Sequence, residues 1–325
     1  MTAYDWLLVG PTGQVGRCVL RRLAGTGRLA VLMRRTSTAQ ASAELRAMLG
    51  ERQPLPDIVL GDVHTADLPV CDSIIHAGGH SLLVGSHEAY FTGNVLTTVR
   101  LAERARETGA HLHLLSSVMV AMTSDRPVRE TDPALPHPGQ TRYALSKCLS
   151  ELAAERIVPP DALSIYRTAD TVPDPRYLAA DTRANHWLTL LLGAGAAGEC
   201  RSGPQRRIWA VPGDELGQAL RGLIRSRNPG RFHLVGASYP MPTIREAGNG
   251  VTGGGLSRLG RRLAALADGF PVPCLDDTHT RQVLASLGVT WRTLDDDYWR
   301  CYAEEAARAV AARPAGIGGT MWWGS

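Results

Sequence analysis

A tyrosine, a lysine and two serines have the residue types and spacing needed for proton transfer. Tyr143 and Lys147 are four residues apart, so they share a face if their segment is helical. The Lys147 ammonium would favour the phenolate and lower a tyrosine pKa that is ordinarily about 10. Tyr143 would then be a usable general acid for a carbonyl oxygen. Ser116 and Ser117 end an apolar run upstream, and a hydroxyl at that place would polarise the same carbonyl.

A glycine-rich turn near the N-terminus has the spacing of a phosphate-binding loop. Three glycines follow the apolar run Trp6–Val9 and open a segment with helical spacing. A tight turn and a close approach of the backbone to a pyrophosphate both need residues without a Cβ, and a helix N-terminus offers free N–H groups. This context predicts a dinucleotide site rather than a glycine turn without a ligand. The predicted contacts in this loop are Gly10, Thr12, Gly13, Gln14, Val15 and Gly16.

Two arginines indicate which dinucleotide is bound. Arg34 and Arg35 follow the second apolar run, where an NAD-binding protein usually places an acidic residue for the ribose 2′-OH. Guanidinium groups there can bind the 2′-phosphate of NADP through paired hydrogen bonds. The alternative is that one or both arginines are solvated surface residues. The sequence therefore favours NADP(H) over NAD.

These residues must be positioned by the elements around them. Short apolar runs alternate with helical segments over the first two-thirds of the chain, which predicts an α/β fold with helices on both faces of a parallel sheet. We therefore expect a Rossmann-type doubly wound sheet, with Ser117 at a strand end in the ligand-binding crevice. The predicted strands are Trp6–Val9, Leu29–Met33, Asp57–Leu60, Ser73–His76, His111–Leu115 and Leu163–Tyr166. The predicted helices are Gly16–Leu23, Ser42–Leu49, Val95–Arg106 and Tyr143–Ile157.

The last third of the chain has a different pattern. We expect residues 1–170 to form the NADP-binding core, completed by about 205–236, and residues 171–204 and 237–325 to form a smaller, mostly helical substrate-binding region. The later segments with helical spacing are Leu256–Ala267, Asp277–Leu287 and Asp295–Ala312. Trp322 and Trp323 lie in a tail that either docks on a partner, forms a homodimer contact or has no such role.

Composition excludes several classes of protein. The 325 residues carry a net charge of +4 with both signs scattered along the chain, which does not indicate a nucleic-acid or membrane surface. No signal peptide is evident, and no apolar run approaches the ~20 residues of a membrane span. The six cysteines form no CxxC pair, so we expect reduced thiols in a cytoplasmic protein. His76 with His80, and His111 with His113, lack the further ligands of a metal site, so none is predicted.

Together the glycine loop and the Tyr143–Lys147 spacing resemble the extended short-chain dehydrogenase/reductase superfamily. The segment Leu60–Val63 is similar to the one whose aspartate and following backbone contact the adenine, and Ile74–Gly79 is similar to the fourth strand and its cofactor-lining turn. Asn94–Thr98 resembles the start of a family helix. The resemblance implies further cofactor contacts from Asp62, Val63, Ala77, Gly78, Asn94, Tyr143 and Lys147. It also implies that Ser117, rather than Ser116, is the catalytic serine.

Within the superfamily, the chain is most similar to thioester reductase-like domains, which end some polyketide and peptide assembly lines. The segments that carry this resemblance are Arg34–Ser37 with Ala43–Leu49, His76–Gly79, Val211–Asp214 and Thr280–Gly288. The sequence departs from the pattern at Ala77, which replaces an amide, and at Gly213, which replaces a valine. Val172–Asp174 lacks a usual glycine. These departures lie on the substrate side, so they put the substrate in doubt more than the cofactor.

The resemblance implies an NADPH-dependent reductase that acts on a carbonyl group or an acyl thioester, free or bound to a carrier. Tyr143 would protonate the oxygen, Ser117 would polarise it, and Lys147 would hold the nicotinamide ribose. Further substrate contacts are expected from His80, Ser116 and Arg167. An NAD-dependent nucleotide-sugar epimerase or dehydratase is the alternative enzyme, although Arg34 and Arg35 stand where it would need an acidic residue. A non-catalytic NADP(H) sensor or scaffold is the other alternative.

Overall fold

The fold is built on a seven-stranded sheet. The computed structural model describes residues 3–81, 86–124, 126–182, 186–193, 207–240 and 274–312. The strands of the large sheet are β1 (Tyr4–Val9), β2 (Leu29–Met33), β3 (Asp57–Leu60), β4 (Cys71–His76), β5 (His111–Ser117), β6 (Leu163–Thr168) and β9 (Gly230–Leu234). Their order is β3-β2-β1-β4-β5-β6-β9, and every neighbouring pair is parallel. This confirms the predicted Rossmann-type doubly wound sheet.

The strand order reverses next to β1. The chain runs from β1 through β2 to β3 on one side and then returns to β4 on the other side of β1. In open α/β sheets, ligands bind outside the carboxyl ends of the strands at such a switch point. Gly10 follows β1 and Ala77 follows β4, and the Ala77 N–H donates to the carbonyl of Val9 at 3.0 Å. The predicted glycine loop therefore lies at the switch point.

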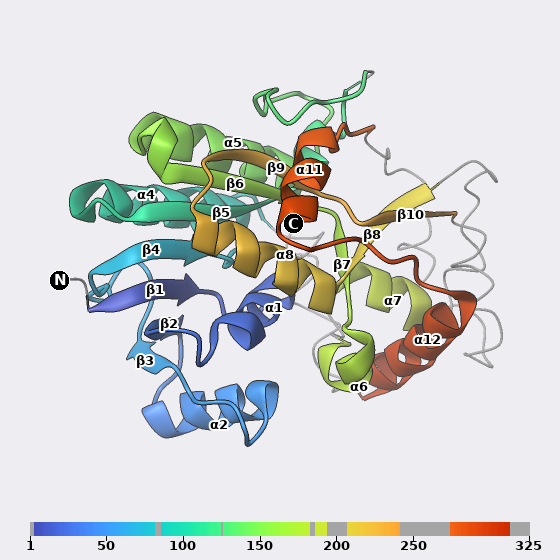
Figure 1. Ribbon diagram of the computed structural model, residues 1–325, viewed down its shortest axis with the longest axis horizontal. Helices are drawn as coiled ribbons and strands as arrows, with labels where there is room; N and C mark the ends of the chain where they lie inside the picture. The colour runs from blue at the N-terminus through green and yellow to red at the C-terminus, as the bar shows by residue number, and fades with distance from the viewer. Residues whose placement is uncertain are drawn as a thin grey trace.

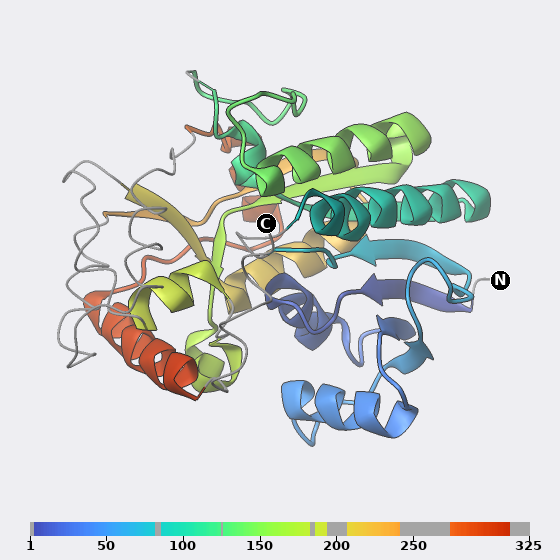
Figure 2. The same ribbon diagram turned by 180° about the vertical axis from the view of Figure 1, so that it is seen from behind.

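Helices cover both faces of the sheet, with α1 and α8 on one face and α4 and α5 on the other (Figures 1 and 2). Alternate residues of each strand serve the two faces: Leu8 and Val31 join the cluster of α1 and α8, while Leu7 and Ala30 join the cluster of α4 and α5. The helices are α1 (Gln14–Leu23), α2 (Thr38–Leu49), α3 (His87–Tyr90), α4 (Thr97–Thr108), α5 (Arg142–Ile157), α6 (Leu178–Asp181), α7 (Trp187–Gly193), α8 (Gly213–Ser226), α11 (Thr278–Ser286) and α12 (Asp296–Ala311). Shorter helical turns are η1 (Phe91–Leu96), η2 (Val118–Ala121), η3 (Pro160–Ala162) and η4 (Pro175–Tyr177).

A second region lies beside the carboxyl ends of the strands (Figure 1). Its three-stranded sheet has the order β10-β8-β7, formed by β7 (Asp170–Val172), β8 (Arg207–Pro212) and β10 (Ala237–Pro240). Helices α7 and α12 pack against each other, and Leu191, Trp299 and Tyr302 are fully buried in its core. We expected a mostly helical region, and the structure shows a three-stranded sheet there in addition to the helices. Within residues 205–236, which we expected to complete the cofactor-binding core, the chain supplies β8 to the small sheet and β9 to the large one.

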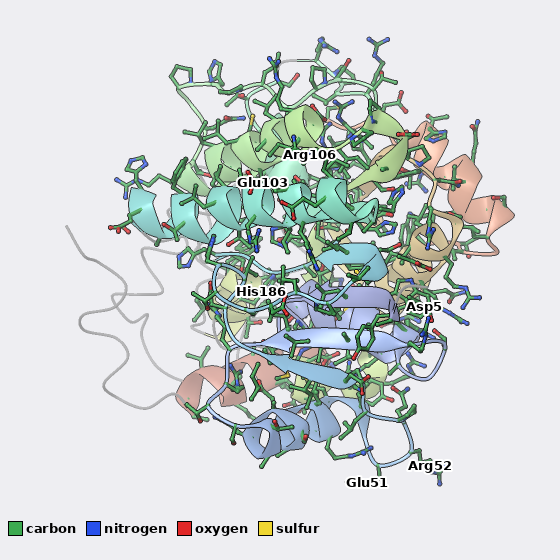
Figure 3. All side chains as sticks on the ribbon, turned by 90° about the vertical axis from the view of Figure 1, so that its left-hand side faces the viewer. Asp5, Glu51, Arg52, Glu103, Arg106 and His186 are labelled. Atoms are coloured by element: carbon green, nitrogen blue, oxygen red, sulfur yellow. The ribbon has the colours of Figure 1, made fainter. Side chains whose placement is uncertain are left out.

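One predicted helix begins differently from the expectation. Instead of a helix over Val95–Arg106, the chain forms the π-helical turn η1 and then α4. Leu101, Ala102 and Ala105 of α4 are buried, whereas Arg106 is exposed on its outer side (Figure 3). A π-turn places side chains at angles that the usual helical spacing does not, and such turns are frequent at functional sites. The predicted helix Leu256–Ala267 and the tail with Trp322 lie outside the described residues.

Candidate functional site

Two of the three glycines in the loop are required by the protein's own packing. Gly10 has a φ of +81°, and a Cβ there would clash with the backbone of Gly78 in the turn after β4. A Cβ on Gly16 would clash with the carbonyl oxygen of Gly10, because α1 passes directly over the turn. These glycines hold β1, α1 and the turn after β4 close together.

Gly13 differs from the other two glycines. It is the N-cap of α1, and a Cβ there would meet its nearest protein atom, the Gly10 carbonyl oxygen, at 3.5 Å, which is an ordinary contact. The fold itself therefore does not require glycine at this position. A helix N-terminus without a side chain in front of it is a fitting place for a phosphate, because its N–H groups and dipole attract an anion.

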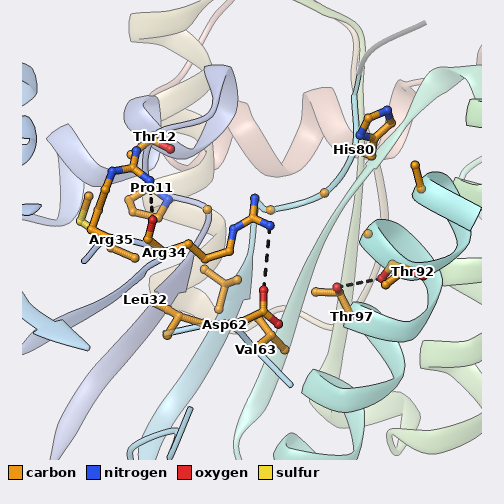
Figure 4. Close-up of a pocket in the computed structure, with 17 residues that line it drawn as sticks. Pro11, Thr12, Leu32, Arg34, Arg35, Asp62, Val63, His80, Thr92 and Thr97 are labelled. Atoms are coloured by element: carbon orange, nitrogen blue, oxygen red, sulfur yellow. Dashed lines mark hydrogen bonds and ion pairs between the residues drawn. The ribbon is translucent and has the colours of Figure 1, made fainter. Parts of the chain in front are cut away.

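A cavity of about 350 Å³ opens at the switch point (Figure 4). It is lined by the glycine loop, the end of β2, the turns after β3 and β4, and the start of the η1–α4 helix. The predicted contact residues that line it are Gly10, Thr12, Arg34, Arg35, Asp62, Val63, Gly78 and His80. The predicted cofactor contacts that do not line it are Gly13, Gln14, Val15, Gly16, Ala77, Asn94, Tyr143 and Lys147.

The two arginines at the end of β2 are in different states. Arg35 donates from Nε and Nη2 to the Glu44 carboxylate at 2.7 and 2.9 Å, so this edge of its guanidinium group is already used. The Arg34 side chain is 80% exposed, and its nearest acidic oxygen, on Asp62, is 3.9 Å away (Figure 4). A surface pair at that distance contributes little free energy, so Arg34 is available to an incoming anion.

Asn94 supports the cavity wall instead of lining the cavity. Its Oδ1 accepts from the His80 N–H at 2.6 Å, and its Nδ2 donates to the His80 carbonyl at 3.1 Å and to Ser146 Oγ at 2.8 Å. The side chain is fully buried, and all of these bonds are internal. Asn94 therefore ties the turn that carries His80 to helix α5.

Ser117 and Tyr143 meet at the carboxyl end of β5. The Ser117 hydroxyl forms a side-chain hydrogen bond with Tyr143 and also accepts from the Met119 N–H at 3.2 Å. Tyr143 stands in the first turn of α5, which begins after the N-cap Thr141. Burial raises the pKa of Tyr143, the bond with Ser117 opposes this, and the charge of Asp170 adds to it. This differs from the lowered pKa that we expected, so the free protein holds Tyr143 as a neutral phenol.

Lys147 is the only lysine in the chain. It is buried, and its Nζ donates to the carbonyl of Leu115 at 3.0 Å. Burial lowers its pKa to about 8, while the charge of Glu151 acts in the opposite direction. His76 lies at the end of β4, and burial together with the charge of Lys147 lowers its pKa to about 3. The ammonium therefore faces a neutral imidazole.

Ser116 and Arg167 do not occupy the positions expected of substrate contacts. Ser116 Oγ donates to Glu151 Oε1 at 2.5 Å, and Arg167 Nη2 donates to Glu151 Oε2 at 2.8 Å. Arg167 and Glu151 are fully buried. Because the side chains of Ser116 and Arg167 are bound within this internal network, we no longer regard either residue as a substrate contact.

His80 remains a candidate for contact with a ligand. It lines the cavity, and its ring meets Tyr90 edge-on with centroids 4.8 Å apart. Tyr90 in turn lies 6.4 Å from the ring of Tyr143. A row of rings thus connects the cavity with the hydroxyl groups at the end of β5.

The sequence reasoning missed two carboxylates near Tyr143 and Lys147. Asp170, at the start of β7, accepts from the Trp187 indole at 2.6 Å, and burial raises its pKa to about 6. Glu151 follows Lys147 by one helical turn. Glu151 could have been found from the sequence, since Tyr143, Lys147 and Glu151 are spaced by four on one predicted helix. Asp170 carried no such signal, because it begins a strand that the sequence did not indicate.

The histidines set aside as metal ligands have other partners. His111 Nε2 is bonded to Ser164 Oγ at 2.7 Å, and His113 Nδ1 to the Tyr166 hydroxyl at 2.8 Å, both buried within the sheet. Over the described ranges, no group of three or more histidine, cysteine or acidic side chains is arranged to hold a metal ion. No helix in that part of the chain is both long enough and apolar enough to cross a bilayer.

The fold and the site define a Rossmann-type protein with Ser117, Tyr143 and Lys147 gathered around the end of β5 and the start of α5. Residues 6–163 match the model of the NAD dependent epimerase/dehydratase family. This match agrees with the predicted resemblance to the extended short-chain dehydrogenase/reductase superfamily. A comparison with curated proteins found no match.

Solved structures with the same fold include reductase domains of biosynthetic assembly lines. The reductase domain of the aureusimine biosynthetic cluster has a TM-score of 0.71 and 17% identity, covering 94% of this chain and 92% of that chain. A thiolation-reductase di-domain from an archaeal non-ribosomal peptide synthetase has a TM-score of 0.73 and 15% identity, and the match covers 93% of this chain and 75% of that chain. MoeE5 in complex with UDP-glucose and NAD has a TM-score of 0.66 and 19% identity, and the match covers 94% of this chain and 99% of that chain. At these identities the likeness establishes the fold alone.

Proposed function

We propose that this protein is an NADPH-dependent oxidoreductase that reduces a carbonyl group or an acyl thioester in a biosynthetic pathway. The observation that carries the proposal is the hydrogen bond between Ser117 and Tyr143 beside the sole lysine, Lys147. A neutral phenol held by a serine hydroxyl at the ligand-binding end of a parallel sheet has the components of a proton donor to a carbonyl oxygen.

The residues around the cavity fit a dinucleotide phosphate. Gly13 leaves the N-terminus of α1 open to a pyrophosphate, and Asp62 and Val63 line the cavity, where they would contact an adenine. Arg34, rather than Arg35, would bind the 2′-phosphate, because Arg35 is already paired with Glu44. When bound, NADPH supplies the hydride that the proposed reduction needs.

The chain's own residues would then handle the oxygen and the proton. Ser117 donates a hydrogen bond to the substrate carbonyl and orients it toward Tyr143. The raised pKa of Tyr143 keeps its proton in place until negative charge develops on that oxygen. After the proton leaves, the nearby Lys147 ammonium favours the resulting phenolate. One of its three N–H groups is bound to Leu115, which leaves two as donors for a ribose hydroxyl.

An acyl group on a carrier protein is the substrate class that the comparisons favour. Two of the similar folds are reductase domains of biosynthetic systems, and one of them is joined to a thiolation domain. We extend that role to this chain as a proposal, with a cytoplasmic location and no nucleic-acid partner. A homodimer stays a prediction.

The test is NADPH oxidation, followed by absorbance, against a panel of acyl thioesters, aldehydes and ketones. Tyr143→Phe should reduce turnover by about 10²–10⁴-fold, because it removes the proton donor. Its affinity for NADPH should stay that of the wild type. If the wild-type protein turns over no member of the panel, or if Tyr143→Phe remains fully active, the proposed catalysis is wrong.

A second function deserves a test because MoeE5, a protein of similar fold, was solved with UDP-glucose and NAD. A nucleotide-sugar epimerase or dehydratase regenerates its cofactor and retains it. It would therefore copurify with NAD and convert a nucleotide sugar without net oxidation of NADPH. The exposed Arg34 at the end of β2 argues against this candidate, since the ribose of NAD is usually held by an acidic residue there.

A further inference from the structure

Three consecutive residues at the end of β5 are each bound by a residue of helix α5. The pairs are Leu115 with Lys147, Ser116 with Glu151, and Ser117 with Tyr143. The three helix residues are spaced by four, so they lie along one face of α5. The strand end and the helix are therefore joined by a row of polar contacts. The contact with Ser116 is made by Glu151, which has no part in the mechanism described above.

The middle contact is made by a carboxylate with a full set of donors. Besides Ser116, Glu151 accepts from Arg167 Nε at 3.1 and 3.2 Å and from Arg167 Nη2 at 2.8 Å. Arg167 lies on β6 directly opposite Ser116 in the sheet register. Hydrogen bonds of this kind favour the ionised form of a buried carboxylate, whereas removing one partner would leave the other charge buried and unpaired.

Glu151 is also the acidic group that acts on Lys147. The groups that face Lys147 in the described part of the chain are Glu151 from α5, His76 from β4 and the Leu115 carbonyl from β5. Tyr143 lies one helical turn before Lys147 on α5. His76 is neutral because burial lowers its pKa to about 3, and the raised pKa of Tyr143 keeps it neutral near pH 7. Arg167 stands next to Glu151 and tempers its negative charge without removing it.

We infer that Glu151 is a positioning residue for the proposed reaction, which fixes the end of β5 through Ser116 and keeps the chain's single lysine in its charged form. The inference rests on the proposed function for its catalytic meaning. The electrostatic part, however, is a property of the protein itself and can be measured without a substrate.

The sole lysine makes that measurement direct. Protein grown with lysine labelled with ¹³C at Cε gives one side-chain signal, because Lys147 is the only lysine, and its chemical shift follows protonation. The wild-type midpoint is expected at about pH 8, because burial lowers the pKa of Lys147 to about that value. In Glu151→Gln, which keeps the shape and loses the charge, the midpoint should fall by about one pH unit or more.

Glu155→Gln is the matched control. Glu155 lies one turn further along α5 and is paired with Arg231 near the surface, away from the end of β5. Its lysine midpoint should equal that of the wild type. Equal midpoints in the wild type and Glu151→Gln would overturn the electrostatic part, and a similar fall in Glu155→Gln would show that any charge on the helix acts alike.

Ser116→Ala tests the positioning part and covers the case in which Glu151→Gln does not fold. It removes the hydroxyl group that donates a hydrogen bond to Glu151 and leaves every charged side chain in place. We expect kcat to fall about tenfold, the size of one hydrogen bond, with an unchanged KM for NADPH and an unchanged lysine midpoint. An unchanged kcat would contradict the inference.

The pH profile separates failure of this inference from failure of the proposed function. The alkaline limb of kcat should move to lower pH in Glu151→Gln, because less of its lysine is charged, and should stay in place in Glu155→Gln and Ser116→Ala. If the wild type has no reductase activity, the proposed function fails while the lysine titration still decides the role of Glu151. If the wild type is active and Glu151→Gln has an unshifted limb, the inference alone fails.

Discussion

The cofactor end of the sheet and the end of β5 are built on opposite principles. The cavity by β1 is lined by the glycine-rich turns and by side chains near the surface, among them the exposed Arg34. At β5, the side chains of Lys147, Glu151 and Arg167 are buried and bound to one another or to the strand. The contrast teaches that local turns determine the shape of the first region, whereas contacts between charged residues far apart in the sequence determine the second. Each of the following predictions tests one side of this contrast.

The largest effect is expected from adding a methyl group to the glycine loop. Gly16→Ala should lower the free energy of unfolding by about 3 kcal/mol, because its Cβ would overlap the Gly10 carbonyl. Gly13→Ala should leave stability almost unchanged, since its Cβ would make an ordinary contact at 3.5 Å, but should weaken NADPH binding. Urea denaturation and cofactor titration of both variants separate fold from ligand. Equal loss of stability in both would break the distinction between these glycines.

Lys147→Met should make the protein more stable at pH 7. A pKa lowered from 10.5 to about 8 corresponds to a cost of about 3 kcal/mol, and losing the bond to Leu115 offsets about 1 kcal/mol of the gain. The net gain is therefore about 2 kcal/mol. Between pH 8 and 10.5 the unfolded wild type binds more protons than the folded one, so wild-type stability rises with pH and the gap narrows. Unfolding curves at pH 7 and pH 10 test this, and a less stable variant at pH 7 would contradict it.

The smallest effect is expected at the end of β2. Arg34→Ala should weaken NADPH binding about tenfold, through loss of one exposed charged contact, and leave NADH binding unchanged. Arg35→Ala is the comparison, and it should change NADPH affinity less because Arg35 is held by Glu44. Fluorescence titration with both cofactors measures the difference. A larger loss of NADPH affinity in Arg35→Ala than in Arg34→Ala would show that Arg35, and not Arg34, binds the 2′-phosphate.

The contrast also explains how far the sequence could be interpreted. The strand Leu29–Met33 was predicted with its observed bounds, because a buried parallel strand is a continuous apolar run. The edge strand Asp57–Leu60 was also predicted with its observed bounds, although its two end residues are exposed. The glycine loop was equally accessible, since its spacing is local. Strands β7, β8, β9 and β10 were not predicted. β7 and β10 have only three and four residues, and β8 directly follows a polar segment.

At the candidate site, the sequence indicated the residues but not their electrostatic state. Helix α5 buries Ser146, Lys147, Ser150 and Glu151, so its inner face lacks the apolar pattern that marks a packed side. The partner of Glu151 lies on β6, and nothing in local spacing connects Arg167 to α5. The same limit applies to Tyr143, whose raised pKa results from burial that only the folded chain provides.

The late arrival of β9 has a consequence for biosynthesis of the protein. β9 pairs with β6 at the edge of the large sheet, yet the chain between Thr168 and Gly230 first enters the small sheet (Figure 1). A ribosome adding roughly 5–20 residues per second needs several seconds to make that stretch. During this interval β6 remains an open edge in the nascent chain, available to pair with other molecules. Slower growth at low temperature or help from chaperones should therefore improve the yield of soluble protein.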